Sequence, residues 1–418
     1  MKFIMKKLGK ILIIIILLIM YIYVASICLI PDHIIVFEGE NIKIPTLFGI
    51  NVSQNNNKND YIFSNTIQTV TNLDTKKLDE IGKINLSLNL FNKIPLKQID
   101  VDIIKKTKVV PLGDAIGLKL YTKGVLVVGM SEIKGENEVS YKPYQDSGIK
   151  EGDMIIEINN NKINNTEDLI KNVNSSDGNK IDIKYLREEE TCNTSIIPVK
   201  TENNEYKIGL WVRDAQAGVG TATFYEKETK KFCALGHAIT DIDTGEIVNI
   251  ANGELVSTNI VSITKGKKGS PGQIKGVIDG SKTLGDIQKN TPFGLYGKIS
   301  EYNDITSGED EIEVALRDEI QEGNAEIICE LEDGKKEKYN IKIEKIFLGN
   351  SSDNKSMKIK IVDDKLIQKT GGIIQGMSGS PIIQNGKFVG AVTHVLVQSP
   401  TEGYAVFADM LIKQMNEI

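Results

Sequence analysis

The sequence predicts a mainly β chain in which an N-terminal transmembrane helix precedes a small α+β domain and a larger β-rich domain of barrel type. The first observation is an apolar run from Ile11 to Ile30, long enough to cross a bilayer as a helix. The second is a series of short alternating strands separated by glycine-containing turns. In the last and largest of these β-rich parts, helical periodicity is clear only in the C-terminal DMLIKQM. We expect four parts with these bounds: 1–30, 31–104, 105–200 and 201–418.

Composition is that of an ordinary globular protein. The 418 residues are 25% charged and 40% hydrophobic, with a formal net charge of -6, so nothing favours nucleic-acid binding and we predict none. Of the four cysteines, Cys28 lies in the apolar run and the other three are widely spaced. Neither a disulfide framework nor a zinc site is predicted, and we expect no metal and no cofactor.

The N-terminal segment, residues 1–30, predicts a membrane anchor. Lysines precede the apolar run, which indicates that the N-terminus stays inside and the rest of the chain is exported; they are Lys2, Lys6, Lys7 and Lys10. No small-residue cleavage site follows the run, which favours a signal-anchor, and a cleaved secretory signal is the alternative.

Residues 31–104 predict a stalk and a small β-rich segment. The tract Asn51–Asp60 (NVSQNNNKND) is polar and has nothing to bury, which is typical of a flexible stalk. After it, KINLSLNLF and KQIDVDII alternate as strands do.

Residues 105–200 resemble a PDZ domain of the kind attached to bacterial proteases. The resemblance is carried by Ser147-Gly148-Ile149, Gly152-Asp153 and Ile155–Asn159, and Thr166 is a plausible N-cap of a short helix. PDZ domains bind a peptide as an added strand, and loop N–H groups hold its terminal carboxylate. We expect the peptide-binding loop to contain these residues: Gly113, Ile116, Gly117 and Leu118.

Residues 201–418 contain a serine in a tight turn, GMSGSPII. The turn resembles the one on which trypsin-like serine proteases present their nucleophile, and the N–H groups of Gly376 and Ser378 would form the oxyanion hole. Met377 and Ser380 depart from the pattern of those proteases. KKGSPGQIKGVI near residue 270 weakly echoes SGSPIIQNGKFVGAV near 380, which makes a two-barrel duplication possible.

A serine needs a base, and only three histidines are present. His33 lies beside the anchor and is interpreted as an incidental surface residue. His237, in CALGHAITD, ends an apolar strand and is preferred as the base over His394, which lies in the strand after the nucleophile turn.

A carboxylate should orient the base, and the sequence leaves four candidates: Asp241, Asp243, Asp363 and Asp364. The first pair lies in TDIDTG, which also suits a turn. The second pair follows the alternating strand KIKIV, so one member could face a cleft at the strand end.

Taken together, the anchor, the PDZ-like segment, LGHAITDIDTG and KTGGIIQGMSGSPII resemble the stage IV sporulation protein B peptidases of endospore-forming Firmicutes, over residues 105–418. The resemblance implies Ser378 as nucleophile, His237 as base and Asp363 as acid, with the neighbouring Asp364 leaving that register open. It also implies a peptide or protein substrate, self-cleavage, and a partner that is a membrane-complex regulator of an intramembrane metalloprotease. The place of action would be the space between forespore and mother-cell membranes.

Other interpretations stay open. Cys233 and His237 share one strand face, so a Cys–His dyad or a metal pair is conceivable, and Ser380 is a second candidate nucleophile. A catalytically inactive PDZ scaffold that binds membrane-protein tails, and a general quality-control protease, are the rival functions. Self-cleavage is expected between residues 31 and 100, where the chain is polar and downstream of the anchor.

Overall fold

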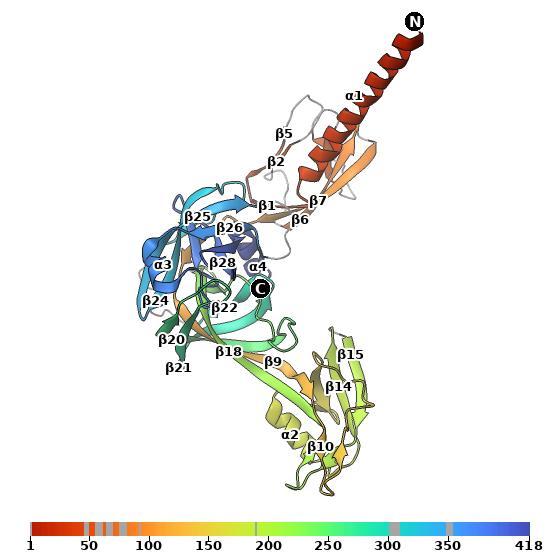
Figure 1. The fold of residues 1–418 in the computed structure, drawn as a ribbon, viewed down its shortest axis with the longest axis vertical. Coiled ribbons are helices and arrows are strands. Elements are labelled where there is room, and N and C mark those ends of the chain that lie inside the picture. Colours follow the sequence, from red (N-terminus) through yellow and green to blue (C-terminus); the bar gives the residue numbers. More distant parts are fainter. Residues whose placement is uncertain are drawn as a thin grey trace.

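The computed structural model describes residues 2–45, 50–54, 62–63, 70–74, 82–91, 93–188, 190–300, 310–347 and 354–418. The chain is mainly β. Figure 1 shows an N-terminal helix beside a small sheet, a central body of curved strands, and a smaller unit that extends from this body on two long strands, β9 and β18.

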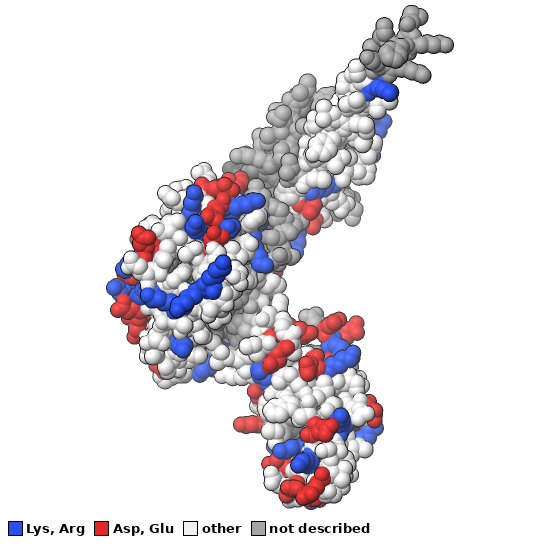
Figure 2. Space-filling view, viewed as in Figure 1, with Lys and Arg blue, Asp and Glu red and all other residues white. Residues whose placement is uncertain are grey.

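The N-terminal helix α1 spans Lys2–Leu29. Its segment Lys10–Cys28 has a mean hydropathy of 3.0 and is largely exposed, with Tyr23 and Ile27 partly buried against the β domain, so its length and composition suffice to cross a membrane, as those of a signal sequence also would. The described surface of this helix is largely uncharged (Figure 2). These features suggest membrane anchoring.

A small β domain follows the helix. Its strands are β1 (His33–Phe37), β2 (Asn41–Pro45), β3 (Ile50–Gln54), β4 (Ile62–Phe63), β5 (Val70–Asp74), β6 (Gly82–Leu90) and β7 (Ile94–Ile104). Five of them form a sheet in the order β1-β7-β6-β3-β4, and β2 pairs with β5. Alternating Leu86, Leu88, Ile99 and Val101 are buried in its core, as the alternating sequence predicts. Of the polar tract expected as a stalk, residues 51–54 belong to β3 and residues 55–60 lie outside the described residues.

His33 is not an incidental surface residue. Its Nε2 contacts the carboxylate of the buried Asp102 on β7, and the Lys413 ammonium lies 2.5 Å from the same carboxylate. Lys413 belongs to helix α4 (Ala408–Asn416), so this cluster joins the N-terminal β domain to the C-terminal helix.

The smaller unit has a PDZ arrangement of strands around one helix. Its elements are β10 (Ile133–Lys134), β11 (Ser140–Tyr141), β12 (Met154–Ile158), β13 (Asn161–Lys162), α2 (Thr166–Asn174), β14 (Ile181–Arg187), β15 (Glu190–Ile196), β16 (Val199–Lys200) and β17 (Tyr206–Lys207). Asn165, rather than Thr166, is the N-cap of α2, and its side chain accepts the Asp168 N–H. Leu169 and Val173 turn the apolar face of α2 onto the sheet.

The central body contains two barrels of six strands. In the first, β9 (Ala115–Met130) pairs with both β18 (Leu210–Tyr225) and β20 (Ile250–Thr264), and the ring β9-β20-β21-β22-β19-β18 returns to β9. Its other strands are β19 (Lys231–Ala234), β21 (Gln273–Thr291) and β22 (Gly294–Ile299); β8 (Lys108–Pro111) and β23 (Ile312–Glu313) extend it.

The second barrel closes in the order β24-β25-β26-β29-β28-β27. Its elements are β24 (Gly323–Glu332), β25 (Lys335–Ile346), β26 (Met357–Ile361), α3 (Asp364–Thr370), β27 (Pro381–Gln384), β28 (Lys387–Val395) and β29 (Glu402–Phe407), followed by α4. The two barrels touch where the Gln375 N–H donates to the Gly272 carbonyl at 2.9 Å and the Ile274 N–H donates to the Gln375 carbonyl at 2.8 Å.

The structure divides the chain differently from the expected boundary at residues 200 and 201. The first half of β9 contributes Ile116, Leu118 and Leu120 to the core of the first barrel, whereas its second half joins the sheet of the PDZ unit. The PDZ unit is thus an insertion between two paired strands of the barrel. Sequence order alone hides this, because the insertion begins and ends in the middle of continuous strands.

Candidate active site

The nucleophile turn of the second barrel lies directly on the first barrel. Gly376 and Gly379 have φ values of 99° and 98°, a region that residues with a side chain rarely adopt. A Cβ on Gly379 would lie 2.4 Å from the Thr221 carbonyl oxygen and 2.6 Å from the Leu235 nitrogen. The glycine therefore allows the turn that carries Ser378 to approach β18 and the end of β19 at backbone distance.

His237 comes from a strained turn that follows β19. Leu235 and Gly236 both have positive φ, 73° and 71°, and for a leucine such a conformation costs on the order of 1–3 kcal/mol. The turn is held by the Leu235 N–H, which donates to the Thr221 carbonyl at 3.2 Å. Strain that the surroundings impose in this way is a feature of functional sites.

His237 and Ser378 line one cleft of about 500 Å³ between the barrels. The first barrel supplies His237 and the second supplies Ser378 and His394. The other residues that line the cleft are Leu118, Gln216, Ala217, Gly218, Val219, Gly220, Leu235, Ile239, Gln273, Ile373, Ile374, Gln375, Gly376, Thr393 and Val395. Among the described residues, the two histidines are the ionisable side chains that line the cleft.

The His237 ring is held in the tautomer that a general base requires. Its Nδ1 lies 2.8 Å from the Ala238 carbonyl oxygen, and because a carbonyl can only accept, Nδ1 carries the proton. The lone pair is then on Nε2. Burial lowers the pKa of His237, and the bond to Ala238 opposes this effect only partly. The imidazole is therefore neutral near pH 7, as a proton acceptor must be.

Ser378 is within the same cleft but its hydroxyl has a different partner. Its Oγ donates to the Thr393 carbonyl at 3.0 Å, and no hydrogen bond joins it to His237 among the described residues. Rotation about the serine side-chain bond redirects the hydroxyl, and catalytic hydrogen bonds commonly tighten only when substrate is bound.

Two backbone N–H groups in the turn that carries Ser378 have no acceptor among the described residues. The N–H groups of Gln375, Met377 and Gly379 donate to backbone carbonyls, whereas those of Gly376 and Ser378 donate to no described residue. Both belong to the turn that lines the cleft. Such a pair of free donors is what a developing oxyanion needs.

His394 places a second imidazole in the cleft. Its ring centroid lies 5.6 Å from that of His237, and its Nδ1 is 2.9 Å from the Thr393 hydroxyl. Burial is the main cause that lowers the pKa of His394, and the charges of His237 and Lys355 lower it further, to about 4. His394 is therefore also neutral over the physiological range.

Asp363, the residue expected to orient His237, is elsewhere. It is the N-cap of α3: one carboxylate oxygen accepts the Leu366 N–H at 3.1 Å, and the other accepts the Asn340 N–H at 3.2 Å. Asp364 is exposed in the first turn of the same helix. The spacing Asp-x-x-Leu before a helical run is typical of such a cap.

The turn aspartates do not reach His237 either. Asp241 is buried and accepts hydrogen bonds from Arg213 and Gln216 and from the Asp243 N–H. Within the described chain no carboxylate forms an ion pair with His237. The Ala238 carbonyl is the group that fixes its tautomer.

The alternative nucleophiles have unsuitable surroundings. Cys233 is fully buried, and burial raises the pKa of its thiol to about 12, so the reactive thiolate is absent near neutral pH. Ser380 is also fully buried and donates to the Met377 carbonyl at 2.7 Å. No group of three or more potential metal ligands occurs in the part of the chain that the structure describes.

The expected PDZ loop is a barrel strand. Ile116, Gly117 and Leu118 lie in β9 with β18 on one edge and β20 on the other, and the Gly113 N–H donates to the Ala222 carbonyl. A peptide cannot add to a strand that is paired on both edges. The expectation was wrong because this segment has the sequence pattern of a PDZ loop but pairs with β18 and β20 of the first barrel.

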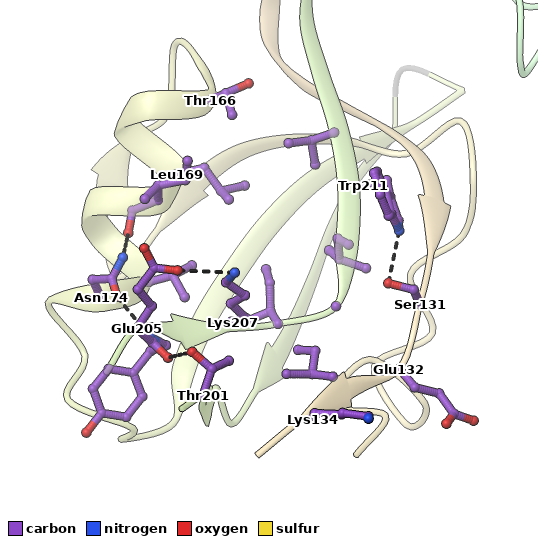
Figure 3. A pocket seen from close by; sticks show the side chains of 18 residues that line it. Ser131, Glu132, Lys134, Thr166, Leu169, Asn174, Thr201, Glu205, Lys207 and Trp211 are labelled. Atoms are coloured by element: carbon purple, nitrogen blue, oxygen red, sulfur yellow. Dashed lines mark hydrogen bonds and ion pairs between the residues drawn. The ribbon is translucent and has the colours of Figure 1, made fainter. Parts of the chain in front are cut away.

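A groove of about 610 Å³ instead lies between α2 and the start of β18 (Figure 3). Leu169 and Val173 from α2 and Leu210 and Val212 from β18 line it. Gly209, with φ of 76°, turns the chain into the strand. The sequence carried a signal for this site, since Ile208-Gly209-Leu210 repeats the Ile-Gly-Leu of the segment taken for the loop.

Comparison with known proteins identifies both parts. A PDZ domain model matches residues 116–197, and the model of the SpoIVB peptidase S55 family matches residues 204–412. A Clostridium perfringens (strain 13 / Type A) protein named as a zinc metalloprotease is 28% identical over 82 residues, which are 20% of this chain and 24% of that relative's length. The crystal structure of the PDZ domain of an SdrC-like protein from Listeria monocytogenes is 23% identical, covers 22% of this chain and 87% of its own, and has a TM-score of 0.18. Because the S55 model covers half of its residues, the chain belongs to the SpoIVB peptidase S55 family.

Proposed function

We propose that the protein is a membrane-anchored serine endopeptidase in which Ser378 is the nucleophile and His237 the general base. The observation that carries the proposal is the shared cleft, where a serine on a glycine turn, an imidazole with its lone pair on Nε2 and two free N–H groups meet. Membership of a peptidase family supports the same reaction.

The reaction follows from these groups. Ser378 Oγ attacks the substrate carbonyl carbon while its proton passes to His237 Nε2, and the carbonyl oxygen becomes an oxyanion held by the N–H groups of Gly376 and Ser378. The C–N bond breaks when His237 returns the proton to the leaving amine. Water then attacks the acyl-enzyme in the same manner and releases the acid. Asp363 is assigned no step, because its carboxylate caps α3.

The resemblance of the sequence extends the proposal to a role in sporulation signalling. The protein would be exported to the space between forespore and mother-cell membranes and would cleave itself between residues 31 and 100. It would then clip a membrane-complex regulator of an intramembrane metalloprotease, which triggers processing of a late sigma factor. The PDZ unit would bind the peptide or protein substrate in the groove beside α2.

Covalent labelling tests the nucleophile. Full-length protein in detergent, treated with a fluorophosphonate, is expected to gain one phosphonyl group on Ser378. Ser380→Ala should still be labelled, Ser378→Ala should not, and His237→Ala should react orders of magnitude more slowly. Absence of labelling in the wild type would favour the inactive PDZ scaffold.

Intact mass over time tests self-processing. The wild type is expected to shorten to a product that begins between residues 31 and 100, and Ser378→Ala to stay intact. A first residue beyond 110 would contradict the proposed site. Broad cleavage of unfolded proteins, rather than of very few substrates, would favour a quality-control protease.

A further inference from the structure

Strand β18 is paired on one edge only for most of its length. Leu210 to Thr221 pair with β9, and β19 joins the opposite edge only from Ala222 onward. No described strand pairs with that second edge between Leu210 and Thr221. A free edge presents a row of backbone N–H and C=O groups that another extended chain can use.

The two ends of this free edge lie in different pockets. Residues 208–212 line the groove beside α2, and residues 216–220 line the cleft that contains His237 and Ser378. A single strand therefore runs from the PDZ groove to the candidate catalytic serine. Its pairing with β9 shifts in register twice on the way, between Trp211 and Val212 and between Arg213 and Ala215.

At the cleft end, the backbone of β18 is turned toward the substrate space. The Thr221 N–H donates to the Ser378 carbonyl at 3.3 Å and the Thr221 carbonyl accepts from Leu235, so both polar groups of Thr221 point away from β9. Alternate residues of a strand share this direction. The polar groups of Val219 and Ala217 therefore also point away from β9, along the wall of the cleft.

At the groove end, the surroundings suit a peptide terminus. The N–H groups of Ile208 and Gly209 donate to no described residue, and the turn that Gly209 makes brings them to the mouth of the groove. Figure 3 shows Leu169 extending from α2 toward the strand, and the aliphatic Val173, Leu210 and Val212 line the groove beside polar residues such as Glu205 and Lys207. This combination fits a free carboxylate followed inward by an aliphatic side chain.

We propose that the free edge of β18 is one continuous docking track for the C-terminal tail of a substrate, with the tail's carboxylate at Ile208–Gly209 and its upstream residues beside Ser378. This inference rests on the proposed peptidase activity. The tail runs antiparallel to β18, because its last residue sits where β18 begins. Residues on paired strands advance one for one, so Ser378 cuts about ten residues before the substrate's C-terminus, roughly 30 Å along the strand.

Photo-crosslinking tests the track without catalysis. The protein is the full-length Ser378→Ala chain in detergent, and the probe is an unstructured peptide of about sixteen residues that ends in valine with a free carboxylate. A photoreactive group at the last residue is expected to label residues 208–212 or α2. The same group about ten residues upstream is expected to label residues 216–220 or 376–378. An upstream probe that labels only the PDZ unit would overturn the proposal.

Cleavage by the wild-type chain tests the distance rule. Residues added at the peptide's C-terminus should move the cut by the same number of residues, whereas residues added at its N-terminus should not move it. Amidation of the terminus should lower kcat/KM about tenfold or more, since the carboxylate is lost. Cuts whose position is unrelated to the C-terminus would contradict the track.

Two matched substitutions test whether the groove beside α2 recognises the free carboxylate. Ile170→Asp changes an exposed side chain of the groove and should lower kcat/KM for the free-acid peptide to that for the amide. Ile197→Asp, which changes another exposed side chain of the PDZ unit, outside the groove, should not. If crosslinks form as expected but no peptide is cut, the peptidase proposal fails while the track stands.

Discussion

Thr221 of the first barrel donates its hydroxyl to the carbonyl of Gly376 in the second barrel at 2.6 Å. This bond holds the turn that carries Ser378 against β18, and the Thr221 N–H holds the Ser378 carbonyl of the same turn. The geometry of the cleft therefore depends on a side chain that contacts neither the Ser378 hydroxyl nor His237.

Thr221→Val is expected to impair catalysis more than stability. The substitution keeps the shape of the side chain but removes one hydrogen bond, a loss of about 1 kcal/mol, and leaves the Gly376 carbonyl without that donor. We expect kcat to fall about tenfold while the melting temperature falls by only a few degrees. The matched control is Thr283→Val, an exposed threonine of the same barrel. Equal kcat in the two variants would argue against a role for the Thr221 bond.

Asp363→Asn and Asp363→Ala distinguish a helix cap from a triad acid. Asparagine caps a helix as well as aspartate does, so Asp363→Asn should keep kcat/KM within about threefold, whereas Asp363→Ala should lose about 0.5–2 kcal/mol of stability and some activity. A triad acid would behave otherwise, because changing it to the amide lowers kcat about 10⁴-fold. Peptidase assays and thermal unfolding of both variants decide the matter, and a near-complete loss in Asp363→Asn would refute the cap assignment.

The rate of hydrolysis should persist into mildly acidic solution. Burial lowers the pKa of His237, so its imidazole stays neutral below the usual histidine pKa of 6.5. The midpoint of the acid limb of kcat/KM should therefore lie below pH 6.5. A pH–rate profile from pH 4 to 8 measures it. An acid limb above pH 6.5 would indicate that a carboxylate stabilises the imidazolium.

His394 should make the fold sensitive to acid. Its pKa is about 4 in the folded chain and near 6.5 in the unfolded chain, so the unfolded state binds the proton first as the pH falls. The free energy of unfolding should therefore decrease between pH 6.5 and 4. Thermal unfolding should show a smaller decrease in His394→Asn, and identical slopes would contradict the assignment.

The cluster of His33, Asp102 and Lys413 should hold the N-terminal β domain to helix α4. Asp102 is buried, and although burial opposes it, hydrogen bonds from His33 and Lys413 lower its pKa to about 2. Asp102→Asn should cost about 1.5–3 kcal/mol and speed hydrogen exchange in α4. Asp100→Asn, on the exposed face of β7, is the control and should leave exchange in α4 unchanged.

Short sequence patterns predicted individual elements of this molecule, but they did not predict how its strands pair across the chain. The glycine turn around Ser378 and the apolar N-terminal run are short-range signals, and they specify their structures directly. The partner of His237 could not be predicted in this way, because the Ala238 carbonyl has no sequence signature. The PDZ loop was misplaced because Ile116-Gly117-Leu118 and Ile208-Gly209-Leu210 have the same sequence, and only long-range pairing shows which of them keeps a free edge.

The insertion of the PDZ unit between β9 and β18 has a mechanical consequence. A protein tail bound along β18 and pulled from the cleft end would load the backbone hydrogen bonds in parallel, along the strand, rather than one after another. Both strands continue into the closed ring of the first barrel, so the load would pass into that barrel and not into a linker. A substrate docked along β18 would therefore be expected to resist dissociation under tension.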